Sequence, residues 1–159
     1  MNLKDSGERR EFETGAVRDV ADGKGRCDLI PLDVASEIIG DTILQHIETY
    51  IQTGAIDEIL DVIRVFSIKR YGSTYNALLE VSKQYEDGAK KYLERNWQKG
   101  IPTHCYVDSG VRHYLKFHRG DTDEPHDRAF LWNMYGLVWT HKHIPSLIDL
   151  PFITNEVSK

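Results

Sequence analysis

Hydrophobic residues recur at three- and four-residue steps along most of the chain, which is the period of an amphipathic helix. Pro31 suits the first turn of a helix, and the apolar pattern continues from Val34 until Gly54. Similar runs predict further helices over 56–71, from Ser73 to Tyr92, over 103–118 with a stop at Gly120, and from Pro125 to Val138. Five helices without a convincing alternating strand predict an all-α fold.

The two ends of the chain lack this period. Residues 1–30 contain four glycines and many charges, which predicts an extended or looped N-terminal arm. The tail from Pro145 onward is expected to be irregular. A length of 159 residues suits a single domain, 1–159, with a core of its own.

Composition and charge narrow the class of protein. Hydrophobic residues make up 40% and charged residues 28%, as in ordinary globular proteins. The net charge of −5 argues against a nucleic acid duplex as partner, because duplex binding depends on concentrated Lys and Arg. No stretch approaches the roughly 20 apolar residues of a spanning helix. The N-terminus also lacks the apolar run of a signal peptide, so we expect a soluble, cytoplasmic protein with no membrane partner.

Acidic residues gather between Tyr85 and Asn133, on segments that are also predicted to be helical. Glu124 and Asp127 are three residues apart, so both carboxylates lie on one helix face. Hard divalent cations prefer oxygen ligands, and carboxylates from two packed helices can hold them. The candidate ligands for Mg²⁺ or Mn²⁺ are Glu86, Asp87, Asp108, Glu124 and Asp127.

A plainer interpretation of the same acids is that they form surface ion pairs. The spacing of Glu86 to Lys90, of Asp87 to Lys91 and of Asp108 to Arg112 is four residues in each case, which is ordinary for exposed helix pairs. Acids in a first turn also complement the helix dipole.

Basic, amide and aromatic residues near these acids are suited to a nucleotide. Lysine and arginine neutralise phosphates, while amides and aromatic rings bind the edge and face of a base. Gly23 to Arg26 is a loop that could close over phosphates, although it lacks the spacing of a P-loop. The candidate substrate-binding residues are Lys24, Arg26, Lys90, Lys91, Asn96, Trp97, Arg112, His113, Lys116 and Asn133.

Several blocks along residues 12–140 together resemble the phage dATP/dGTP diphosphohydrolases, the MazZ-type branch of the MazG-like, all-α nucleoside triphosphate pyrophosphohydrolases. The blocks are Thr14 to Asp19, Gly23 to Pro31, Glu86 to Tyr92, Arg95 to Gly100, Asp108-Ser109, Arg112-His113 and Trp132-Asn133. Compared with shorter relatives, residues 41–71 resemble a helical insertion.

The resemblance implies a MazG-like helical bundle that cleaves a purine deoxynucleoside triphosphate into the monophosphate and pyrophosphate. It also implies Mg²⁺ or Mn²⁺ as cofactor, a homodimer or homotetramer, and a role in phage 2-aminoadenine DNA metabolism in the host cell cytoplasm. The MazG-like pattern is Glu-x-x-Glu followed by Glu-x-x-Asp. Glu124 and Asp127 satisfy the second pair, but Lys83 precedes Glu86 where the first acid is expected. We expect Glu86 and Asp127 to be catalytic.

Two other functions stay open on the sequence alone. The His126-Asp127 dipeptide, with His104 or His113 before it and Asp149 after it, is compatible with an HD-type triphosphohydrolase that releases triphosphate. A non-catalytic helical phage protein could instead bind a partner through the apolar helix 56–66. Product analysis with a panel of dNTPs would separate the three hypotheses.

Overall fold

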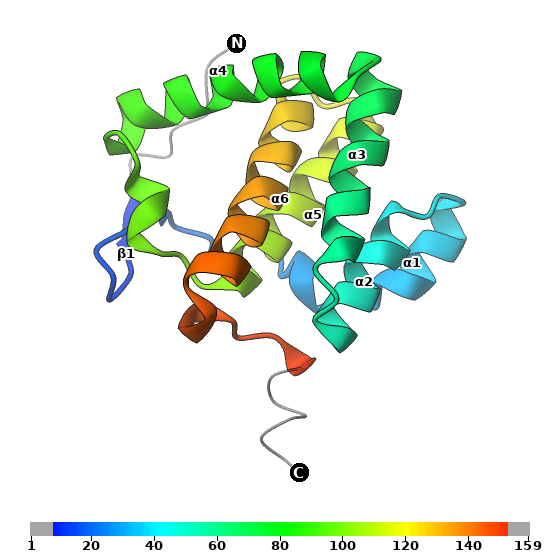
Figure 1. Ribbon diagram of the computed structural model, residues 1–159, viewed down its shortest axis with the longest axis horizontal. Coiled ribbons are helices and arrows are strands. Elements are labelled where there is room, and N and C mark those ends of the chain that lie inside the picture. Colours follow the sequence, from blue (N-terminus) through cyan, green and yellow to red (C-terminus); the bar gives the residue numbers. More distant parts are fainter. Residues whose placement is uncertain (1–7, 153–159) are drawn as a thin grey trace.

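The computed structural model describes residues 8–152 as a helical bundle with a small hairpin on one side (Figure 1). The elements in chain order are β1 Arg9–Glu11, β2 Val17–Asp19, η1 Cys27–Leu29, α1 Leu32–Ile39, α2 Ile43–Thr53, α3 Asp57–Tyr71, α4 Thr74–Tyr92, η2 Asn96–Lys99, α5 Thr103–Arg119, α6 His126–His143 and η3 Pro145–Leu147. The dominance of helices confirms the predicted all-α class.

Helices α5 and α6 pack side by side at the centre of the bundle, joined by the short segment 120–125 (Figure 1). Helix α4 crosses one end of this pair, and α3 packs against both α4 and α6. The ring of Phe66 on α3 lies 4.8 Å from that of Phe130 on α6 and 6.2 Å from that of Tyr114 on α5. Residues 41–71, which resemble an insertion, therefore contribute to the hydrophobic core.

Glycine lets the two central helices approach closely. A Cβ atom built on Gly136 of α6 would lie 2.3 Å from the ring of Tyr106 on α5. One built on Gly110 of α5 would lie 2.5 Å from Met134 of α6. The tyrosine ring is rigid, so position 136 needs a residue without a Cβ, whereas at position 110 the flexible end of Met134 would have to move. This tight contact places the functional side chains of the two helices within reach of each other.

The structure corrects the single helix predicted over 31–54. Gly40 adopts a left-handed conformation with φ of 82° and ends α1, its N–H donating to the carbonyl of Ser36. Asp41 then caps the start of α2 by accepting from the N–H of Ile43 at 3.1 Å. The phenol of Tyr114 donates to the second oxygen of Asp41 at 2.6 Å. The break is therefore held by a contact to α5 as well as by glycine.

The N-terminal arm is also more ordered than a loop. Strands β1 and β2 pair in antiparallel register, with Arg10 opposite Arg18. The side-chain amide of Asn96 binds the backbone of Val17 through both of its atoms, at 2.9 Å each. Two hydrogen bonds from one side chain thus attach the hairpin to η2. Within residues 8–152, no helix is long and apolar enough to cross a membrane.

Candidate functional site

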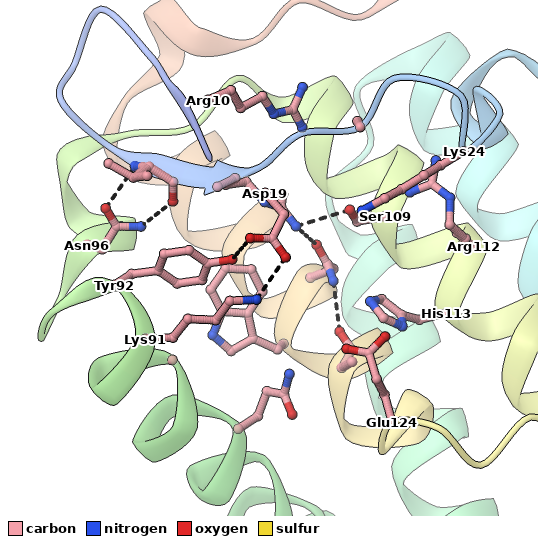
Figure 2. Close-up of a pocket in the computed structure, with 18 of the residues that line it drawn as sticks. Arg10, Asp19, Lys24, Lys91, Tyr92, Asn96, Ser109, Arg112, His113 and Glu124 are labelled. Carbon is pink, nitrogen blue, oxygen red and sulfur yellow. Dashed lines mark hydrogen bonds and ion pairs between the residues drawn. The ribbon is translucent and has the colours of Figure 1, made fainter. Parts of the chain in front are cut away.

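A cavity of about 390 Å³ opens where the hairpin faces the end of α4, the middle of α5 and the start of α6 (Figure 2). Each wall comes from a different part of the chain, so only folding assembles it. The lining residues are Arg10, Val17, Arg18, Asp19, Ala21, Lys24, Gln84, Gly88, Lys91, Tyr92, Asn96, Ser109, Arg112, His113, Lys116, Glu124, Ala129, Trp132 and Asn133.

The cavity wall carries a strong excess of positive charge. Six of the lining residues are lysine or arginine and two are acidic, so 6 − 2 leaves an excess of four positive charges, with histidine counted as neutral. The chain as a whole has a net charge of −5. Positive charge gathered in one cavity of a negatively charged chain indicates an anionic ligand, because the low-dielectric cavity walls focus the electric field of the cations.

Arg18 is the most unusual of these cations because its Nη1 atom is buried and no acidic partner is found for it among residues 8–152. Its Nη2 donates to the hydroxyl of Ser109 at 3.1 Å and to the amide oxygen of Asn133 at 3.2 Å. The guanidinium lies over the rings of Tyr106 and Trp132, at 5.7 and 5.6 Å from their centroids. Its Nη1 has no hydrogen-bond partner among the described residues. Burial lowers the pKa of Arg18, as expected where desolvation disfavours the charged form.

Asp19, next to Arg18 in the sequence, accepts hydrogen bonds that connect the hairpin to the end of α4. Its carboxylate accepts from Arg9 at 2.9 Å, from the ammonium of Lys91 at 2.8 Å and from the phenol of Tyr92 at 3.0 Å. Figure 2 shows Lys91 and Tyr92 reaching Asp19 from the end of α4. The carboxylate thus fixes the position of Lys91, a predicted substrate-binding residue, at the cavity wall.

The five predicted metal ligands do not come together. Glu86 is exposed and lies 3.5 Å from Lys90, as the surface-pair interpretation predicts. Asp87 pairs with Arg128 at 2.7 Å, and Asp127 pairs with Arg70 at 3.0 Å.

Asp108 is buried, 2.6 Å from Arg112, and also accepts the backbone N–H of Cys27 at 2.7 Å. The carboxylate therefore holds Arg112 in the cavity wall and attaches the arm to α5. Of the five predicted ligands, Glu124 alone belongs to the residues that line the cavity.

A different set of metal-binding groups does converge at the same end of the cavity. One ligand atom each from His113, Glu124 and His126 lies within 4.8 Å of the others. The Nδ1 atoms of the two histidines are 2.8 Å apart, and the Nε2 of His126 lies 2.8 Å from a carboxylate oxygen of Asp123. Asp121, Asp123 and His126 form an overlapping second group.

Most predicted substrate-binding residues line the cavity, namely Lys24, Lys91, Asn96, Arg112, His113, Lys116 and Asn133. Three do not. Arg26 pairs with Asp28 at 2.7 Å, and Lys90 pairs with Glu86 at the surface. Trp97 packs its ring against Trp139, with centroids 5.0 Å apart.

Sequence reasoning assigned no role to Arg10, Arg18, Asp19 or Ser109. The available signal was that Arg18, Asp19 and Ser109 belong to blocks of the resemblance, whereas Arg10 belongs to none. Arg10 and Arg18 reach the cavity because they face each other across the hairpin, which the sequence analysis did not predict.

Comparison with protein families decides the identity of the chain. A family model described as dATP/dGTP diphosphohydrolase, N-terminal, matches residues 64–149, which is more than half of the sequence. The chain belongs to the dATP/dGTP diphosphohydrolase family. No curated protein and no solved structure shows a significant match to it.

The matched region of this diphosphohydrolase covers the cavity residues on α4, α5 and α6. The hairpin and the following loop precede that region, yet they supply Arg10, Arg18 and Lys24, half of the lysines and arginines in the wall. The site of this family member is therefore completed by its N-terminal arm.

Proposed function

We propose that the chain hydrolyses dATP or dGTP between the α- and β-phosphates, with Mg²⁺ or Mn²⁺, to give the monophosphate and pyrophosphate. The observation that carries this proposal is the cationic cavity with the buried guanidinium of Arg18 at its base. The family, named for dATP and dGTP, supports the class of substrate. We further propose that all of this activity resides in the single domain described above.

The charges of the cavity match a polyphosphate. A buried cation costs several kcal/mol in lost hydration unless an anion compensates it. Among the described residues the hydrogen-bond partners of Arg18 are neutral, so a phosphate in the cavity that Arg18 lines would supply the missing anion. Lys24, Arg112 and Lys116 line the same cavity and would share the remaining phosphate charge. Arginine adds directional, charge-assisted hydrogen bonds to this attraction.

The base would lie against the aromatic part of the wall. Trp132 lines the cavity and packs at a tilt against Tyr85 and Tyr106, with ring centroids 5.9 and 5.8 Å away. A large, rigid ring of this kind offers a face on which a purine can stack. Asn133, beside it, uses its amide N–H on the carbonyl of Ala129 and its oxygen on Arg18. We therefore propose that Asn133 positions Arg18 in the cavity wall rather than binding the base itself.

The cavity also fits a metal carried by the substrate. Mg²⁺ is commonly bound through one or two carboxylates together with substrate phosphates and water. Asp19 and Glu124 are the two acids in the wall, and Asp19 is engaged by Lys91 and Tyr92. Glu124 lies beside His113 and His126 at one end of the cavity, and we assign it as the residue that would hold the metal on the protein side. When bound, the metal would polarise a phosphoryl oxygen and assist the attack of water.

The experiment that tests this proposal is incubation of the chain with each dNTP and Mg²⁺ or Mn²⁺, followed by mass analysis of the products. Pyrophosphate and dAMP or dGMP are expected. Release of triphosphate would instead support the HD-type alternative. Of the residues of that alternative, His113 lies against His126, whereas His104 and Asp149 bond to each other and Asp127 pairs with Arg70. No turnover of any dNTP would favour the non-catalytic alternative.

We also propose that the chain assembles as a homodimer or homotetramer and acts in phage 2-aminoadenine DNA metabolism. Exposed apolar side chains on the outer face of α4 support assembly, since Tyr75 is 80%, Leu78 53% and Leu79 68% exposed. Apolar patches of this kind commonly mark interfaces. Light scattering during gel filtration measures the assembly directly, and a monomer would contradict it.

A further inference from the structure

We propose that His113, Glu124 and His126 bind a first-row transition-metal ion, with Asp123 as the carboxylate that orients His126. The catalytic meaning of this site rests on the proposed function, because the site opens into the same cavity. Binding of the ion itself can be measured without nucleotide. The proposal differs from the all-carboxylate ligand set predicted from the sequence.

The first observation is the arrangement of the two imidazoles. His113 on α5 and His126 at the start of α6 face each other through their Nδ1 atoms, 2.8 Å apart. The two facing nitrogens can share at most one proton, so at least one presents a lone pair to the other. Two imidazole nitrogens directed at one point from adjacent helices are typical ligands of a transition metal.

The second observation fixes which nitrogen of His126 is available. An ionised carboxylate only accepts hydrogen bonds, so Asp123, 2.8 Å from Nε2, holds the proton of His126 on that atom. The lone pair of His126 must then lie on Nδ1, facing His113. Metal-binding histidines almost always donate their other N–H to a carboxylate or carbonyl in this way. His126 is 2% exposed, so its ring is also held by packing.

His113 is suited to the same role. Its Nδ1 faces that of His126, and the neutral ring offers the lone pair of this atom when its proton lies on Nε2. Metal–nitrogen bonds of ~2.0–2.1 Å in a tetrahedral site place two nitrogens roughly 3.3 Å apart. The pair would have to open by about half an ångström, which small ring rotations can provide.

Glu124 completes the set and connects it to the cavity. Its carboxylate lies within 4.8 Å of the ligand atoms of both histidines and also lines the cavity wall (Figure 2). Three protein ligands leave a further position open to water or to a substrate oxygen, as in catalytic rather than structural metal sites. Asp123 and Asp121 lie beside His126, and Asp121 is paired with Arg119.

The donor atoms also indicate which ions should bind. Two nitrogens and one oxygen favour Co²⁺, Ni²⁺ or Zn²⁺, whereas Mg²⁺ prefers oxygen ligands and keeps much of its water. The site should therefore distinguish Co²⁺ from Mg²⁺ in the absence of nucleotide. The carboxylates predicted from sequence would not produce this preference, since they are oxygen donors alone.

The test is calorimetric titration of Co²⁺ and of Mg²⁺ into the full chain without an affinity tag, together with the visible spectrum of bound Co²⁺. We expect one equivalent of Co²⁺, bound at least about tenfold more tightly than Mg²⁺. His113→Gln and Glu124→Gln should abolish the Co²⁺ spectrum. Asp123→Ala should weaken binding by about 10–100-fold, the usual effect of losing an orienting partner. His118→Gln, an exposed histidine of α5, is the matched control and should bind as the unmodified chain does.

The variants replace side chains that are exposed or half-buried, and circular dichroism would verify that each is folded. Absence of Co²⁺ binding, equal affinity for Mg²⁺, or unchanged binding in His113→Gln and Glu124→Gln would each overturn the site. Hydrolysis of dNTPs with Mg²⁺ in a chain that does not bind Co²⁺ would remove this inference and leave the proposed function intact. Co²⁺ binding without turnover of any dNTP would support the metal site and contradict the proposed function.

Discussion

Replacing Arg18 by methionine should lower the activity of this protein while leaving its unfolding free energy nearly unchanged. The variant keeps an unbranched, apolar side chain that can pack on Tyr106 and Trp132, but it removes the buried charge. Two hydrogen bonds from the charged guanidinium to Ser109 and Asn133 are lost, each of which contributes about 1.5–3 kcal/mol to stability. The two ring contacts contribute about 0.5–2 kcal/mol each. Against these losses stands the penalty of several kcal/mol for burying a charge.

These terms nearly cancel, so we expect the unfolding free energy of Arg18→Met to stay within about 1 kcal/mol of the original value in urea titrations. Substrate binding should respond differently. A hydrogen bond to a charged group contributes about 1.5–3 kcal/mol, and kcat/KM for dATP or dGTP should fall by roughly 10–150-fold. Arg64→Met is the matched control, because Arg64 is exposed on α3 and pairs with Asp61.

Nucleotide binding to Arg18 can also be tested without measuring catalysis. A nucleotide that binds only the folded chain raises its melting temperature by mass action, so dATP should stabilise the original chain more than Arg18→Met. If kcat/KM and this thermal shift stay within twofold of the original values, Arg18 does not bind phosphate. If Arg18→Met instead loses several kcal/mol of stability, the argument from an uncompensated buried charge is wrong.

Three further predictions follow from the contacts described above. Glu124→Gln should lower kcat by about 100-fold or more. Asp127→Asn should retain most activity, because Asp127 does not line the cavity. Loss of turnover in Asp127→Asn with intact circular dichroism would instead support the catalytic role predicted from the sequence. Gly136→Ala should destabilise the chain by about 1–3 kcal/mol in urea, since its new methyl group would overlap a tyrosine ring; unchanged stability would mean that α5 and α6 can separate without penalty. The hydrogen bond from Asp149 raises the pKa of His104 to about 10. The His104–Asp149 pair therefore contributes fully to the unfolding free energy below the ordinary histidine pKa near 6.5, and this contribution is lost as the pH rises toward 10. The difference in melting temperature between the original chain and Asp149→Asn should therefore be larger at pH 6 than at pH 10, and an equal difference at both would refute the ion pair.

Local spacing was a good guide to the helices because the hydrogen bonds of a helix are local. The runs that predict α3, α4, α5 and α6 each correspond to one helix of the structure, within a few residues of the expected ends. The prediction was wrong at Gly40, where a periodic pattern continues across a break. Apolar spacing alone does not reveal such a break, because Tyr114 of α5 helps to hold the turn through Asp41.

The spacing of charges was a poorer guide. Three pairs are separated by four residues, and two of them form, Glu86 with Lys90 and Asp108 with Arg112. In the third, Asp87 pairs instead with Arg128 of α6, and Lys91 reaches Asp19 of the hairpin. The partner of a long charged side chain depends on what the neighbouring elements place beside it, which helical spacing does not contain.

The sequence by itself determined the helical class and the stretches that become helices, because these depend on residues a few positions apart. It also supplied the family resemblance and most of the basic residues of the cavity. The tertiary structure decided which charges face the cavity, that Arg18 is buried there with no acidic partner among residues 8–152, and that two histidines meet beside Glu124. These facts depend on the hairpin, on Gly110 and Gly136 bringing α5 and α6 together, and on the desolvation that only a folded chain imposes.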